Sequence, residues 1–249
     1  MPAIDGVIKP RFVALGRLNS FKQAVRRLGV VNGMLWAIGR SVAIASSGRW
    51  VIHRYYFVAQ PVPDKPQVAP GRATGVAIRL IEPNDALVEQ FPRPRHVIAS
   101  RFGMDAHCLA AQKDGTFAGF IWLKEREYPE DEVRCIYKLD PRGNAVWDFD
   151  VHIEPAFRYG RTFIRLWEAA NEWMRERNHR WTISRISAFN PDSLAAHQRL
   201  GTVRVGSALF LRTGRVQFAF LDRAPYVHVG WRADQIPCLL LRAPAAGRP

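Results

Sequence analysis

Ionisable and apolar side chains alternate strictly from Ala145 to Glu154. The ionisable ones are Asp148, Asp150, His152 and Glu154, and the apolar ones are Trp147, Phe149, Val151 and Ile153. A period of two predicts a half-buried strand with one apolar and one ionisable face. Carboxylates and an imidazole on one face can exchange protons with a ligand. The alternative is that these carboxylates are solvated or paired with the many arginines of the chain.

A basic turn follows this strand and opens a helix. Pro155 cannot extend a strand, and the turn Arg158-Tyr159-Gly160-Arg161 combines a glycine with two positive charges. Apolar residues then recur at helical spacing as far as Met174. The first amides of a helix are unpaired and its dipole is positive there, so this junction suits an anion such as a phosphate.

Further elements surround this unit. A strand is predicted at 181–189, followed by a helix with Asn190 as N-cap and Pro191 as its first residue, ending at Gly201. Upstream, the pattern predicts a strand at 75–80, short helices within 83–102, and a hairpin at 107–123, with a loop at 124–132. Two further strands flank Thr213-Gly214. The order predicts a mixed α/β sheet.

The composition favours an anionic partner. The formal net charge is +14 and the pI is near 10.5, which suits phosphate-rich cofactors, acidic proteins, anionic lipids or nucleic acid. The alternative is that the arginines reflect a GC-rich genome and carry no function. Three distant cysteines show no CxxC spacing, so we expect a reducing cytoplasm and no disulfide framework. No recognisable metal motif exists, and we expect no metal.

The first 70 residues form a basic amphipathic extension and linker in this interpretation. Apolar residues recur at helical spacing within 9–47, among seven Lys or Arg and no acid. Arg40 and several glycines interrupt the apolar stretch, which favours a helix in the plane of an anionic membrane surface over a crossing. The alternative is a helix packed on the main domain or on a second subunit. A strand at 50–62 precedes a proline-rich boundary near residue 70, the main domain spans 71–241, and 242–249 should be disordered.

Residues 75–221 resemble the GNAT superfamily of N-acyltransferases. The strand motif apolar-x-apolar-x-Pro of that family is matched by Val151, Ile153 and Pro155, and its glycine turn by 157–163. In the last helix, Asn190, Ser193 and Gly201 fall in register with the family motif, and His197 takes the place of its tyrosine. The resemblance implies a central, mostly antiparallel sheet with splayed parallel strands, flanked by helices.

The resemblance also implies a chemistry. An amine attacks an acyl thioester directly, with acetyl-CoA or a longer acyl-CoA as co-substrate and an acyl carrier protein as an alternative donor. Asp148 and Asp150 are the preferred bases, and His197 would protonate the leaving thiolate, the alternative being a partly exposed histidine without a role. The donor-binding residues that it implies are Val151, Ile153, Arg158, Tyr159, Gly160, Arg161, Thr162, Asn190 and Ser193.

The acceptor stays open among three hypotheses. The first is a lipid-type amine such as a sphingoid base, acylated by a cytoplasmic enzyme at the periphery of the inner membrane. The second is an ordinary acetyltransferase of a small amine or protein, with the N-terminal helix structural or at a homodimer contact. The third is a non-catalytic protein that binds nucleic acid through its positive charge, although the sequence contains no recognised nucleic-acid-binding motif.

Overall fold

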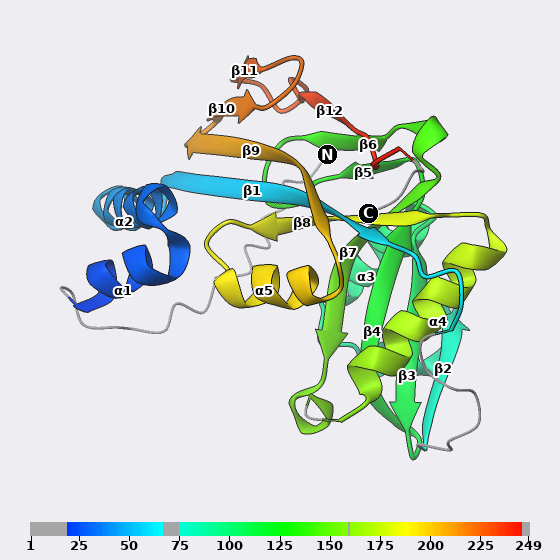
Figure 1. The fold of residues 1–249 in the computed structure, drawn as a ribbon. Coiled ribbons are helices and arrows are strands. Elements are labelled where there is room, and N and C mark those ends of the chain that lie inside the picture. Colours follow the sequence, from blue (N-terminus) through cyan, green and yellow to red (C-terminus); the bar gives the residue numbers. More distant parts are fainter. Residues whose placement is uncertain (1–18, 67–74, 159, 246–249) are drawn as a thin grey trace.

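A computed structural model describes residues 19–66, 75–158 and 160–245. Nine strands form the main sheet: β1 (Trp50–Pro61), β2 (Val76–Ile81), β3 (His107–Lys113), β4 (Thr116–Lys124), β7 (Ala145–Ile153), β8 (Trp181–Ser187), β9 (Val203–Thr213), β10 (Val216–Leu221) and β11 (Val227–Gly230). Their order across the sheet is β11-β10-β9-β1-β8-β7-β4-β3-β2 (Figure 1). Every neighbouring pair is antiparallel except β7 and β8, which are parallel. The expected fold class, a mixed and mostly antiparallel sheet, is confirmed.

A second, three-stranded sheet was not expected from the sequence. It consists of β5 (Glu127–Pro129), β6 (Ile136–Leu139) and β12 (Cys238–Leu241), in the order β12-β6-β5. The expectation of a loop throughout 124–132 is therefore wrong, since β5 lies inside it. These strands have only three or four residues, and β6 pairs with β12 far away in the sequence, which local patterns do not reveal.

Helices cover the main sheet on both faces. They are α1 (Asn19–Leu28), α2 (Val30–Ala45), α3 (Arg95–Gly103), α4 (Thr162–Glu176) and α5 (Pro191–Arg199), with short 3-10 turns η1 (Ala86–Gln90), η2 (Pro141–Gly143) and η3 (Pro155–Phe157). The apolar side of α4 packs on β3, β4 and β7. On the other face, η1 and α3 cover β3 and β4, and the small sheet covers β1, β7 and β8 (Figure 1).

Strand β1 lies in the middle of the main sheet. It pairs with β8 on one side and with β9 on the other, both antiparallel. Residues 50–61 are therefore part of the main sheet, although the sequence places them before the expected boundary. That boundary, near residue 70, falls within 67–74 and so lies outside the described residues. In the expected C-terminal tail, Arg242 pairs with Asp140, and Ala243 packs against the core.

Candidate functional site

The parallel strands β7 and β8 separate at Asp148. Their ladder runs from the pair Ala145–Trp181 to the pair Asp148–Ser184 and stops there (Figure 1). Beyond this point β7 pairs only with β4, and β8 pairs only with β1. Within the described residues, the β7 edge at 149–153 therefore has no strand partner on its β8 side. Such an edge presents backbone N–H and C=O groups that a ligand can bind.

A β-bulge divides the ionisable residues of β7 between two faces. Asp150 pairs with Trp122, whereas Asp148 pairs with Leu123, so Phe149 has no opposite partner. One extra residue shifts the alternation by one. Asp148 consequently lies on the α4 face of the sheet, while Asp150 lies on the α3 face. The expectation that these carboxylates share one face is wrong for this reason.

Asp148 is buried and held by two hydroxyl groups. Its Oδ2 accepts hydrogen bonds from Thr182 Oγ1 and Ser184 Oγ, both at 2.6 Å, and only 3% of the residue is exposed. Burial raises the pKa of this carboxyl, and attraction to His197 is the largest of the effects that oppose the rise. The structure therefore brings together two of the three candidate catalytic residues. They come from β7 and α5, 49 positions apart in the sequence.

The ring of His197 is oriented by its own helix. Its Nδ1 lies 2.9 Å from the carbonyl oxygen of Ser193, one turn earlier in α5. A carbonyl oxygen can only accept, so Nδ1 carries the proton in this contact and Nε2 is left for another partner. The expected N-cap of α5 is confirmed, since the Asn190 side chain accepts from the Ser193 amide at 3.1 Å.

Asp150 is bound by two arginines. Arg93 approaches both carboxylate oxygens, at 2.9 and 2.7 Å, and Arg101 Nη1 lies 2.7 Å from Oδ2. The side chain of Asp150 is 12% exposed and that of Arg101 is 8% exposed. Both carboxylate oxygens of Asp150 are therefore occupied by guanidinium groups in charge-assisted hydrogen bonds. Its contacts tie β7 to α3 and to the segment before it.

The turn after β7 places positive charge at the start of α4. Arg158 donates from Nε to the carbonyl oxygen of Ile153 at 3.1 Å. The N-cap of α4 is Arg161, and no described side chain caps the first amides of that helix. A hollow of 300 Å³ adjoins this turn on its β2–β3 side, lined by Lys113, Gly160, Arg161 and Thr162 among others. Tyr159 lies outside the described residues.

The remaining candidates on β7 and its turn face different surroundings. Val151 and Ile153 are partly buried against the α4 side of the core. His152 Nε2 lies 3.1 Å from Glu154 Oε1, and its ring stacks near Phe117. Among the described residues, no group of three or more His, Cys, Asp or Glu side chains could hold a metal ion.

A second ionisable cluster, which the sequence did not indicate, lies on the opposite face of the sheet. Arg185 of β8 pairs with Glu130 at 3.0 Å and with Glu132 at 2.7 Å. Tyr55 donates to Glu132 at 2.6 Å, and its hydroxyl lies 3.0 Å from His53 Nδ1. The acidic run 130–132 looked like part of a solvated loop, and only an arginine within the apolar pattern of β8 could have signalled its partner.

The separated parallel pair, the strand order around it and the helix after β7 are the features that the resemblance to the GNAT superfamily implies. The arrangement is similar to that of the GNAT fold. No protein-family model matches the chain, and no curated protein sequence matches it either.

Solved GNAT structures are similar to this chain at low identity. A GCN5-related N-acetyltransferase from Sphaerobacter thermophilus has 14% identity and a TM-score of 0.46, over 69% of this chain and 55% of that chain. A tandem GNAT protein from the clavulanic acid biosynthesis pathway has 16% identity and a TM-score of 0.43, over 66% and 55%. An aminoglycoside N-acetyltransferase in complex with CoA has 21% identity and a TM-score of 0.40, over 54% and 91%. With TM-scores below 0.5, these likenesses assign no site.

Proposed function

We propose that this protein is an N-acyltransferase that transfers an acyl group from an acyl thioester to a primary amine. The observation that carries the proposal is the open β7 edge, which begins beside the pair Asp148 and His197. In the reaction the amine nitrogen forms a bond to the thioester carbonyl carbon and the carbon–sulfur bond breaks. The amine loses a proton to a base, and the departing thiolate gains one.

The donor would lie along β7 and end at α4. The backbone groups of 149–153 that lack a strand partner on the β8 side suit the amide-bearing arm of coenzyme A or of a carrier protein, and Val151 and Ile153 flank it. Uncapped amides at the start of α4 suit a phosphate, and Arg158 and Arg161 add positive charge nearby. A Cβ added to Gly160 would meet only a carbonyl oxygen at 3.5 Å, so the fold leaves room for a ligand there.

The catalytic roles follow from the two environments. With Nδ1–H held by the Ser193 carbonyl, Nε2 of His197 would first take up a proton, and the resulting imidazolium would donate it to the departing sulfur. Asp148 is too buried to meet a substrate, so we assign it no direct contact with the donor or the amine. Asp150 is occupied by Arg93 and Arg101, so we assign it no proton transfer. The amine would lose its proton through a water molecule, because the ionisable side chains of β7 are either buried or already paired with another side chain.

Thiol release tests the proposal. The purified protein is incubated with acetyl-CoA or palmitoyl-CoA and with a small or a long-chain primary amine, and free thiol and acylated product are measured. We expect His197→Phe to lower kcat at least about tenfold while coenzyme A still raises the melting temperature. The matched control is His96→Phe, because His96 is exposed on α3.

Unchanged turnover in His197→Phe would remove that residue from the mechanism. If neither donor raises the melting temperature, releases thiol or yields product with any amine, the acyltransferase proposal fails. Binding of nucleic acid with a steep salt dependence would then favour the non-catalytic alternative. The comparison of donors and amines also decides chain length and acceptor class, and a phosphopantetheinylated carrier protein serves as the third donor.

A further inference from the structure

Helix α2 exposes a continuous apolar stripe. Five of its large apolar side chains are between 49% and 69% exposed: Val30, Val31, Met34, Ile38 and Ile44. Positions three, four and seven apart lie on the same side of a helix, so these side chains form one surface. Phe21 of α1 and Trp50 at the start of β1 are exposed as well. Exposure of so many large apolar groups together marks an interaction surface.

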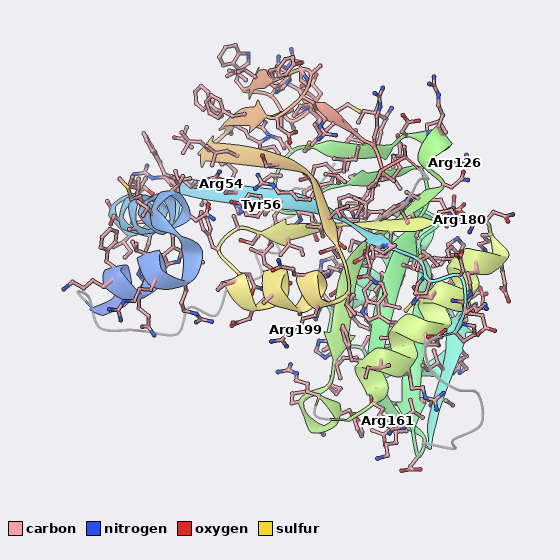
Figure 2. All side chains as sticks on the ribbon, in the orientation of Figure 1. Arg54, Tyr56, Arg126, Arg161, Arg180 and Arg199 are labelled. Carbon is pink, nitrogen blue, oxygen red and sulfur yellow. The ribbon has the colours of Figure 1, made fainter. Side chains whose placement is uncertain are left out.

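The opposite side of α2 is fixed to the protein. Gly33 lies so close to α1 that an added Cβ would approach Val25 to 2.9 Å, and one at Gly39 would approach Ile52 to 3.2 Å. Asn32 Nδ2 donates a hydrogen bond to the Tyr56 hydroxyl oxygen at 3.0 Å, and that hydroxyl can in turn donate to Asn32 Oδ1. Figure 2 shows Tyr56 on β1 close to α2. Because these contacts fix the rotation of α2, the stripe cannot turn inward.

The chain segment that carries the stripe has basic but no acidic residues. From residue 19 to residue 63 the chain has six Lys or Arg residues and no Asp or Glu. Lys22, Arg26 and Arg49 are exposed, and Arg27 forms an ion pair with Asp192 of α5 at 2.6 Å. An apolar surface bordered by cations complements a lipid surface with anionic headgroups.

We propose that α1 and α2 dock this protein on an anionic membrane surface, with the α2 stripe in the interface. A crossing is excluded for α2, because its 16 residues span about 24 Å against the roughly 30 Å of a hydrocarbon core. Among the described helices, none is long and apolar enough to traverse a bilayer. A symmetric contact between two copies would bring each set of cations against its own equivalent, which is unfavourable.

Docking also has a consequence for the proposed site. The ion pair between Arg27 and Asp192 connects α1 to α5, the helix that carries His197. Figure 1 shows α5 between the two N-terminal helices and β7. The docking helices are therefore connected through α1 to the helix that carries a candidate catalytic residue. The docking itself does not depend on the proposed acyl transfer.

Vesicle sedimentation tests the docking with the full chain. Vesicles of phosphatidylglycerol mixed with phosphatidylcholine should bind the protein at low salt, and vesicles of phosphatidylcholine alone should bind it more weakly. The double variant Met34→Asp/Ile38→Asp should bind at least about tenfold more weakly. Val227→Asp, at a position 56% exposed on β11, is the matched control and should bind like the wild type.

A second pair of substitutions tests the basic residues beside the stripe. Ultracentrifugation without vesicles tests whether a second copy of the chain covers the stripe instead. Lys22→Glu/Arg26→Glu should weaken binding to the anionic vesicles and lessen its salt dependence. Circular dichroism establishes that each variant is folded. The proposal is overturned if the wild type ignores anionic vesicles at low salt, or if the α2 variant binds as well as the control. It is also overturned if the wild type is a stable dimer in ultracentrifugation that the α2 variant dissociates.

Discussion

Replacing Glu130 by glutamine should flatten the pH dependence of the stability of this protein. The side chain of Glu130 is 0% exposed, and burial raises the pKa of its carboxyl to about 8. Arg185, with Nε at 3.0 Å, opposes that rise only in part. Glutamine keeps the shape of the side chain and removes its titration.

The direction follows from proton binding. The folded-state pKa lies near 8 and the ordinary value is 4.5, so between these values the folded protein keeps a proton that the unfolded chain has released. Stability contributed by this group therefore falls as pH rises through that window. At about 1.4 kcal/mol per pH unit, the loss amounts to at most about 4 to 5 kcal/mol by pH 8. The Glu130→Gln variant should be as stable as the wild type at pH values below the window and more stable than the wild type above it.

Urea denaturation at about pH 5, 6.5 and 8 measures the effect. The control is Glu127→Gln, because the side chain of Glu127 is 54% exposed in the same segment of the chain. This control should follow the wild-type profile at every pH. Parallel profiles for Glu130→Gln and the wild type would refute the reasoning, since they would mean that Arg185 keeps Glu130 ionised in the folded protein.

Three other predictions concern stability. Gly119→Ala should lower the free energy of unfolding by about 2 kcal/mol or more, because the new Cβ would lie 2.5 Å from a carbonyl oxygen of β7. Gly103→Ala, whose new Cβ would have no neighbouring atom within 4 Å, should leave the stability unchanged, and thermal denaturation compares the two variants. Arg101→Ala should cost about 1 to 3 kcal/mol in urea denaturation, because Asp150 keeps only one of its two arginines; an unchanged midpoint would contradict this. Burial lowers the pKa of His53 from 6.5 to about 4, so the folded protein loses stability as the pH falls through that window. The free energy of unfolding of the wild type should fall by about 3 kcal/mol more than that of His53→Gln, and a pH series of thermal melts measures the difference.

Local signals in the sequence placed most elements of the candidate site. The hairpin of β3 and β4, the strand β7, the helix α4 and the N-cap of α5 follow from alternation, turn residues and capping, which act over a few positions. Asp148 and His197 were both candidates, and the structure brings them together. Their roles stay predictions until activity is measured.

Long-range pairing decided what the sequence could not. A single extra residue at Phe149 sends Asp148 and Asp150 to opposite faces, and no local pattern distinguishes a bulge from continued alternation. The same applies to β1, whose apolar and aromatic composition predicts a strand but not its two partners. The buried cluster around Arg185 exists only because β8 meets the segment 130–132.

By itself, the sequence determined the fold class, the positive charge and the basic turn before α4, because composition and short periods are properties of neighbouring residues. The tertiary structure decided which carboxylate lies near His197, which is held by arginines, and which side of α2 remains uncovered. These outcomes depend on strand register and on the contacts of distant segments. The bulge in β7 is the clearest case, since one unpaired residue changed the surroundings of every ionisable group beyond it.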